Sequence, residues 1–335
     1  MQFWLRTHTV TPSSYSIVYK EIADALRNAG CDVYLGSNLP EWIDDTIEVW
    51  WGNPAYFDWC DKNLPKIAIV LSESRSFVSA QKLAIIQNCK KANVLICPSV
   101  SAAVAYMESP INVNVKVIPF GVNLKSFYYI DRDFYAVPFQ FLHLAAVHQR
   151  KGSWLIPEAF IAAFGEDQRV ALTIATGGVL HGSDMYSRLV SEYGKHPQID
   201  FIQERVESSL ELYHEHHILV HPHLAEGFGL CILEAMATGM PSLVSRCSAP
   251  LEFFDSDSGW WVEMSDSYSP VSETLQSTQG LWRIPDIDSL AEKMKDSRES
   301  AAVYNNKAIH ARQRACMYPW SNFAKGLITE AKGLI

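Results

Sequence analysis

The chain has 335 residues, of which 48% are hydrophobic, 12% aromatic and 19% charged, and its formal net charge is −9. This apolar content excludes a disordered chain, and the length suits two domains of roughly 100–200 residues each. No run approaches the roughly 18 apolar residues of a membrane helix, and no signal peptide is visible at residues 1–6, although weak peripheral contact with a membrane stays open. Lys and Arg never stand more than two in a row, which argues against a nucleic-acid partner.

Cysteine usage bears on the compartment. The seven cysteines form no C-x-x-C pair and are odd in number; they are Cys31, Cys60, Cys89, Cys97, Cys231, Cys247 and Cys316. In a chain without a visible secretion signal, such cysteines are expected to be reduced thiols. We therefore expect a cytoplasmic protein.

The first part of the chain alternates short apolar runs with helical patterns. Strands are predicted at residues 2–6, 32–35, 47–51, 66–71, 94–97 and 113–118. Helices are predicted at residues 14–29, 80–91 and 101–107, the first ending at Gly30. Alternating strands and helices indicate a parallel sheet covered on both faces. An irregular stretch at residues 128–134, before Pro138, is the expected linker.

The same alternation restarts after this linker. Strands are predicted at residues 140–146, 169–175, 200–203, 218–221 and 241–245. Helices are predicted at residues 153–164, 184–193, 208–214, 230–238 and 287–295. Two successive arrays of this kind predict an α/β protein with two Rossmann-like halves.

The most informative segment lies at residues 221–241, where a buried strand leads through a turn into an apolar helix. Gly227 and Gly229 bracket the turn, so the backbone can approach a ligand closely there. A helix that begins near Leu230 presents free N–H groups and the positive end of its dipole, which suits a diphosphate.

Two carboxylates flank this turn. Glu226 stands in the loop, where it could bind a ligand or simply complement the helix dipole. Glu234 lies a turn inside the apolar helix, too deep for a cap, and isolated buried carboxylates are costly. A carboxylate at that place could accept hydrogen bonds from two ribose hydroxyls.

Glu226 and Glu234 form an E-x7-E element, and the segment that holds them resembles the signature of family-four retaining glycosyltransferases with the GT-B fold. Further segments that resemble the family follow in its order, at residues 117–127, 150–152, 201–213 and 248–262. The likeness covers most of the chain from about Ala92 onward. It implies an α/β chain of two Rossmann-like domains facing across a deep cleft.

The resemblance implies that the two domains bind different substrates. Residues 1–135 would bind the acceptor, residues 136–316 would bind the donor, and a helix in residues 317–335 would cross back to the first domain. The donor would be a UDP-, GDP- or ADP-sugar, and the acceptor a saccharide, a lipid-linked hydroxyl or another hydroxyl. The family retains anomeric configuration by a front-face reaction with a diphosphate leaving group. No cofactor and no metal are expected.

Roles for individual residues also follow from the resemblance. Glu226 would bind sugar hydroxyls near the reacting carbon and Lys151 would neutralise the diphosphate, as the two catalytic residues. The other expected donor-binding residues are Arg150 at the diphosphate, Glu234 at the ribose, the backbone at Phe228, Gly229 and Leu230, Arg205 and Val206 at the base, and Gly121 in the crevice. Further candidates are Glu73, His223 and His148.

Departures from the family pattern keep two alternatives open. The family usually has an arginine five residues before its lysine, where this chain has Ala146, so Arg150 or His148 would have to compensate. A catalytically impaired nucleotide-sugar-binding protein with the same fold is therefore one alternative. A glycoside hydrolase using Glu226 and Glu234 is the other, because paired carboxylates carry out that reaction as well.

Overall fold

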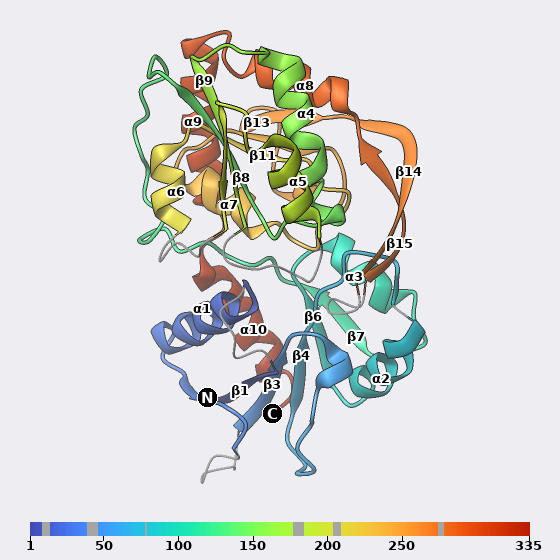
Figure 1. The fold of residues 1–335 in the computed structure, drawn as a ribbon. Helices are drawn as coiled ribbons and strands as arrows, with labels where there is room; N and C mark the ends of the chain where they lie inside the picture. The colour runs from blue at the N-terminus through green and yellow to red at the C-terminus, as the bar shows by residue number, and fades with distance from the viewer. Residues whose placement is uncertain (9–13, 39–45, 78, 177–183, 204–208, 274–277) are drawn as a thin grey trace. The chain divides into compact units, whose positions relative to one another are not determined.

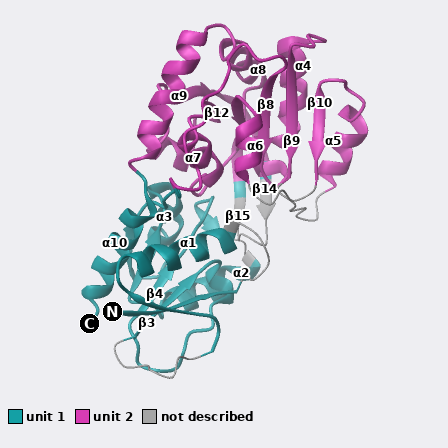
Figure 2. Cartoon of the chain, turned by 90° about the vertical axis from the view of Figure 1, so that its left-hand side faces the viewer, with its two compact units in different colours: residues 1–123, 270–280, 318–335 teal, residues 124–269, 281–317 magenta. Residues whose placement is uncertain are grey.

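The computed structural model describes residues 1–8, 14–38, 46–77, 79–176, 184–203, 209–273 and 278–335 (Figure 1). The chain divides into two compact units (Figure 2). Unit 1 comprises Met1–Asn123, Pro270–Gly280 and Tyr318–Ile335, and unit 2 comprises Leu124–Ser269 and Leu281–Met317. None of the described helices is both long and apolar enough to cross a membrane.

Unit 1 is built on a six-stranded parallel sheet. Its strands, in spatial order, are β2 (Asp32–Leu35), β1 (Gln2–Thr7), β3 (Thr46–Trp51), β4 (Lys66–Ile69), β6 (Val94–Cys97) and β7 (Asn114–Val117). The strands β3 and β6 are buried along their whole length, as expected for a parallel sheet covered by helices. Its helices are α1 (Ser14–Asn28), α2 (Ser79–Cys89), α3 (Val100–Met107) and α10 (Trp320–Lys332), with a short 3-10 helix at Pro54–Tyr56.

The C-terminal helix α10 belongs to unit 1, where it packs on α1. Val122 donates its N–H to the Tyr318 carbonyl at 2.8 Å and fixes the start of this last segment. Gly121 lies so close to the backbone of Trp320 that a side chain at this position would overlap it. Gly121 is thus required for packing within unit 1, whatever else it contacts.

Unit 2 repeats the architecture. Its parallel strands, in spatial order, are β10 (Ile199–Ile202), β9 (Val170–Ala175), β8 (Phe139–Leu144), β11 (Ile218–His221), β12 (Ser242–Ser245) and β13 (Gly259–Val262). Its helices are α4 (Ile156–Phe164), α5 (Met185–Tyr193), α6 (Ser209–Glu215), α7 (Leu230–Ala237), α8 (Ile287–Asp296) and α9 (Ala301–Ala315). Helices α4 and α5 lie on one face of the sheet, and α7 and α9 on the other (Figures 1 and 2). The prediction of two Rossmann-like halves is confirmed.

The hydrophobic core of unit 2 holds its helices against its strands. Apolar side chains from the buried strands, among them Phe141 and Leu172, pack with Phe160 of α4 and Leu290 of α8. The predicted helix over 153–164 is in fact a 3-10 turn at Ser153–Leu155 followed by α4, because Pro157 suits only the first turn of an α-helix.

The division between the units differs from the predicted one, which fell after residue 135. Residues 124–135 belong to unit 2. Arg132 explains this: its guanidinium donates to the carbonyls of Tyr213 at 2.7 Å, His216 at 2.8 Å and Thr238 at 2.9 Å. The stretch is irregular, as predicted, yet it is hydrogen-bonded to unit 2 rather than free as a linker.

A long hairpin was not predicted. Strands β14 (Met264–Glu273) and β15 (Thr278–Pro285) form a three-stranded sheet with β5 (Ser76–Phe77). Residues 278–279 pair antiparallel with 77–76, which is why Pro270–Gly280 belongs to unit 1. The hairpin therefore makes the chain pass between the units twice more than predicted.

Candidate active site in unit 2

The site residues of unit 2 gather at the point where its strand order reverses. From β8 the chain proceeds to β9 and β10 on one side, and β11 then lies on the other side of β8. Open parallel sheets bind ligands in the crevice at the carboxyl ends of the strands at such a reversal. The loop after β8 carries Lys151, and the loop after β11 carries Glu226.

These two loops are fixed against each other by their backbones. Leu224 donates its N–H to the Arg150 carbonyl at 2.7 Å. Gly152 has a φ of 67°, and a β-carbon there would overlap the Pro222 carbonyl oxygen. Only glycine combines that left-handed conformation with so close an approach, so Gly152 sets the position of Lys151.

Lys151, Arg150 and Glu226, which belong to two separate sequence motifs, form one charged cluster. The Lys151 ammonium contacts Glu226 Oε1, and Arg150 Nη1 lies 3.7 Å from Glu226 Oε2. Glu226 is only 5% exposed and Arg150 only 1%, whereas the Lys151 side chain is 16% exposed. Arg150 also donates to the Ala225 carbonyl at 2.9 Å. Lys151 is therefore the cation of the cluster that a ligand can reach, and Arg150 supports Glu226 from beneath.

Electrostatics keep Glu226 ionised. Burial alone would raise its pKa, but the nearby charges of Lys151 and Arg150 hold the pKa well below its ordinary value. Its backbone is anchored as well, since the Glu226 N–H donates to Ser248 Oγ at 2.9 Å. The site thus offers a fixed carboxylate that accepts hydrogen bonds and cannot act as an acid near pH 7.

The helix after this loop begins as predicted at Leu230. Gly229 has a φ of 97° and stands at the N-cap position of α7. Phe228 is buried and packs on Phe253 at a ring separation of 5.2 Å. The turn therefore directs the N-terminal end of α7 to the same sheet edge as Glu226, which suits an anion.

Glu234 is half-buried on α7 and has a partner that the sequence did not identify. The hydroxyl of Tyr213, from α6, contacts Glu234 Oε2 at 3.0 Å and the Cys231 carbonyl at 3.1 Å. The phenol of Tyr213 donates a hydrogen bond to this carboxylate. A carboxylate held in this way can accept further hydrogen bonds from hydroxyl groups.

A hollow lies at the carboxyl end of β10, lined by Tyr186, Phe201, Ile202 and Gln203. The rings of Tyr186 and Phe201 meet edge to face with centroids 6.0 Å apart. Arg205 and Val206, the expected base-binding residues, follow directly in the chain but lie outside the described residues.

The remaining candidates lie elsewhere or have structural contacts. Glu73 is buried in unit 1, in a turn where Ser72 Oγ donates to the Ser74 carbonyl at 2.8 Å. Gly121 also lies in unit 1. His148 is buried beside the cluster, and its carbonyl accepts the Lys151 N–H at 3.1 Å.

Two histidines adjoin Glu226. His223, a candidate from the sequence, and His221, which was not selected, are both fully buried. His221 Nε2 lies 3.4 Å from Glu226 Oε1. His221 was treated as the end of an apolar strand, and its position directly before the motif was the signal that could have identified it.

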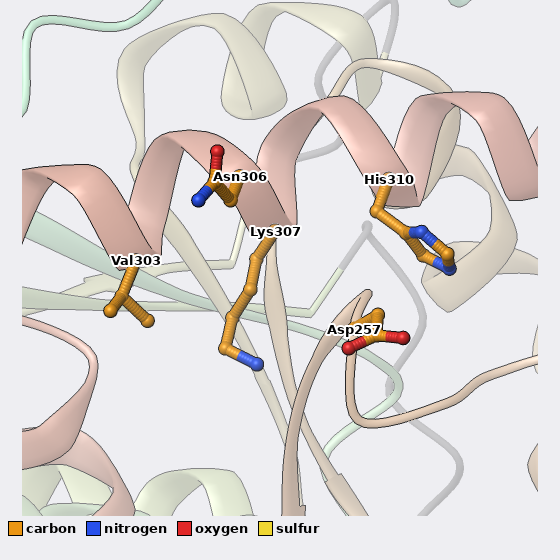
Figure 3. A pocket seen from close by; sticks show the side chains of 5 residues that line it. All are labelled: Asp257, Val303, Asn306, Lys307 and His310. Carbon is orange, nitrogen blue, oxygen red and sulfur yellow. The ribbon is translucent and has the colours of Figure 1, made fainter.

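A second hollow of unit 2 has a structural explanation. It is lined by Asp257, Val303, Asn306, Lys307 and His310 (Figure 3). The Lys307 ammonium donates to the Ser256 and Gly259 carbonyls, and His310 Nε2 lies 3.3 Å from Asp255 Oδ2. These groups hold the loop before β13 on α9. Among the described residues, no group of three or more His, Cys, Asp or Glu side chains could hold a metal ion.

Comparison with known proteins agrees with this geometry. Residues 138–277 match the family model described as glycosyl transferases group 1. The whole chain superposes on Anabaena HepE, solved in complex with UDP and glucose, with a TM-score of 0.73, 14% identity and full coverage of both chains. The chain therefore has the GT-B fold, and the matched family segment holds both Lys151 and Glu226. The resemblance on which the predicted fold class rested is confirmed.

Other similar proteins differ in how much of this GT-B chain they cover. A sucrose-phosphate synthase from Thermosynechococcus elongatus shares the fold over 100% of this chain and 99% of its own, with a TM-score of 0.72 and 17% identity. A sucrose synthase from Nitrosomonas europaea is 35% identical over 150 residues, which is 42% of this chain and 17% of the synthase. A D-inositol 3-phosphate glycosyltransferase from Corynebacterium glutamicum is 29% identical over 168 residues, 48% of this chain and 36% of that enzyme. The chain thus matches only a minor part of these curated relatives.

Proposed function

We propose that this protein is a retaining glycosyltransferase that moves a sugar from a nucleotide-diphosphate sugar to an acceptor hydroxyl. One observation carries the proposal: Lys151 and Glu226 meet at the strand reversal of unit 2, beside the start of α7. A cation, a fixed carboxylate and a helix N-terminus at one point match a diphosphate linked to a sugar.

The diphosphate would be stabilised by Lys151 and by the N-terminal end of α7. The Lys151 side chain is partly exposed, so it can turn from Glu226 toward a phosphate oxygen. Fixed donors and cations stabilise the charge that develops on a leaving group more than they stabilise the bound substrate. The lysine therefore contributes to the rate as well as to binding.

The sugar and the ribose would be held by the two carboxylates. Glu226 stays ionised and accepts hydroxyl hydrogen bonds near the reacting carbon. Glu234, held by Tyr213, would accept from the ribose. The base would lie in the hollow at Tyr186 and Phe201, with backbone contacts from Arg205 and Val206.

The reaction we propose follows the front-face course. The bond between the anomeric carbon and the diphosphate oxygen breaks, and the acceptor oxygen bonds to that carbon on the same face. The acceptor's proton passes to the departing phosphate oxygen, so anomeric configuration is retained. We propose that the cations of the protein suffice and that no metal or other cofactor takes part.

The identities of the donor and the acceptor and the cellular location are proposals as well. UDP is present in the HepE structure, so a UDP-sugar is our first choice, ahead of a GDP- or ADP-sugar. The acceptor would be a saccharide, a lipid-linked hydroxyl or another hydroxyl. All seven cysteines are free thiols, which supports a reducing, cytoplasmic location.

The charge state of Glu226 argues against a glycoside hydrolase. That reaction needs one protonated carboxylic acid beside one carboxylate. Lys151 and Arg150 keep Glu226 ionised instead, and Glu234 faces a phenol. Glu226 therefore cannot supply the protonated acid of that reaction.

Nucleotide release from UDP-, GDP- and ADP-sugars, in the presence of a panel of saccharides, tests the proposal. The wild type should release one nucleotide, its product should keep the donor's anomeric configuration by NMR, and Glu226→Ala should be at least 100-fold slower. Glu263→Ala is the matched control, because Glu263 is exposed in a surface ion pair with Arg246. Nucleotide binding without any release would favour the impaired binding protein, and an inverted product would refute retention.

A further inference from the structure

His221 and His223 contact each other beneath Glu226. Their Nδ1 atoms lie 3.1 Å apart, and His223 Nδ1 also lies 3.1 Å from the His221 carbonyl oxygen. At the outer ends of the pair, His221 Nε2 is 3.4 Å from Glu226 Oε1, and His223 Nε2 is 3.3 Å from the Cys247 carbonyl oxygen. Three of the four ring nitrogens thus make hydrogen bonds, whereas His221 Nε2 is buried beside the Glu226 carboxylate without a hydrogen bond to any residue that the structure describes.

Both rings are neutral near pH 7. Burial lowers the pKa of His221 well below its ordinary value, against the opposing charge of Glu226. Burial likewise lowers the pKa of His223 to about 4. A neutral imidazole has one N–H donor and one lone pair, so the pair has two protons to place on four nitrogens.

The contact between the two Nδ1 atoms requires one proton between them, which leaves two arrangements. In the first arrangement His221 Nδ1 carries this proton. The lone pair of His221 Nε2 would then face the Glu226 carboxylate, and the lone pair of His223 Nδ1 would face the His221 carbonyl oxygen. If His223 Nδ1 carries it, one N–H serves both His221 Nδ1 and the His221 carbonyl. His221 Nε2 then has its proton toward Glu226, and the single unfavourable contact is His223 Nε2 with the Cys247 carbonyl.

We infer that His221 is a positioning residue for Glu226: its Nε2 carries a proton that it donates to Glu226 Oε1 when Lys151 leaves that oxygen, and His223 fixes this tautomer by donating from its own Nδ1. The electrostatics decide between the arrangements, because a lone pair against a buried full negative charge costs more than one against a carbonyl dipole. The role in the reaction rests on the proposed function.

The proton on His221 Nε2 matters when Lys151 turns from Glu226 to the phosphate during the reaction. Lys151 and His221 approach the same oxygen of Glu226. Once the lysine is engaged elsewhere, the imidazole is the donor that lies beside that oxygen and can bind it. Glu226 then keeps the orientation in which it accepts sugar hydroxyls, without a second charge to compete with the phosphate.

Nitrogen NMR tests the tautomers directly. In the full chain labelled with ¹⁵N-histidine, long-range proton–nitrogen correlations distinguish Nδ1–H from Nε2–H rings, and spectra of His221→Gln and His223→Gln assign the signals. The inference predicts the Nε2–H form for His221 and the Nδ1–H form for His223. An Nδ1–H form for His221 would overturn it, whatever the activity of the protein.

Two substitutions test the positioning role. The amide of Gln reaches as far as Nε2 of His, and that of Asn only as far as Nδ1. His221→Asn should lower kcat at least tenfold with the Kd for nucleotide unchanged, and His221→Gln should stay within about threefold of wild type. Exposed His214→Asn is the control. An unchanged kcat in His221→Asn, or equal losses in both variants that follow their Tm values, would refute the role. A wild type that turns over no donor would refute the proposed function and leave the tautomers standing.

Discussion

Replacing Glu226 by Gln separates stability from activity at the candidate site. The substitution keeps the shape of the side chain and removes the charge that compensates Arg150 and Lys151. Removing one partner of a buried ion pair costs about 3–5 kcal/mol. Arg150 keeps its 2.9 Å bond to the Ala225 carbonyl and Lys151 can reach water, so we expect the lower limit, about 3 kcal/mol. At about 2–4 °C per kcal/mol for a unit of this size, the Tm should fall by about 6–12 °C.

The loss of this charge lowers the stability of the protein, but it should not weaken nucleotide binding. With the carboxylate gone, Lys151 is no longer paired and can bind a phosphate without a competing negative charge, so UDP should raise the Tm of Glu226→Gln by at least as much as that of the wild type. Turnover should nevertheless fall at least 100-fold, which corresponds to about 2.7 kcal/mol of transition-state stabilisation. Thermal unfolding with and without UDP, together with nucleotide release, checks both effects. Glu263→Gln should change neither, since exposed pairs contribute at most about 1 kcal/mol. A Glu226→Gln variant with wild-type Tm and turnover would refute the reasoning.

Three further outcomes follow from the same contacts. Lys151→Ala should lower kcat at least tenfold while exposed Lys295→Ala does not, and an equal kcat in both would remove Lys151 from the site. Tyr213→Phe removes the hydroxyl that contacts Glu234, the proposed ligand of the ribose. This variant should have a severalfold higher KM for the nucleotide sugar with little change in kcat, and an unchanged KM would contradict the proposed role of Glu234. Burial lowers the pKa of both His143 and His223 to about 4, so the unfolded chain binds more protons between pH 6.5 and 4. The free energy of unfolding, measured with urea, should therefore fall as the pH falls through this range, by about 3 kcal/mol for each ring, and a pH-independent value would contradict the neutral rings.

Strand and helix positions around the site could be predicted because their signals are local. The apolar run before Glu226 and the glycines of its turn predict β11 and α7 with nearly correct bounds. The contact between Lys151 and Glu226 depends on β8 and β11 being neighbours in the sheet. The hydrophobic periodicity of the sequence does not specify which strands are neighbours. The resemblance assigned both residues to the donor site, and the structure shows that their side chains meet.

What could not be predicted depends on partners distant in the sequence. Arg132 lies in an irregular stretch, and its hydrogen bonds to the carbonyls of Tyr213, His216 and Thr238 tie that stretch to unit 2. The β14–β15 hairpin exposes Tyr268 and Leu281, so burial imposes no apolar alternation on it. Helix α9 did have a signal, a serine cap at Ser300 before buried residues at helical spacing from Tyr304 to Ala315, and it was overlooked.

Equilibrium titration of the full chain with UDP, GDP and ADP tests the central claim most directly, because it asks only whether unit 2 holds a nucleoside diphosphate at Lys151 and α7. We expect one of the three to bind, and Lys151→Ala to weaken that nucleotide at least tenfold while Lys295→Ala leaves its Kd unchanged. Binding of none of the three, or equal affinity in Lys151→Ala and wild type, would contradict the account.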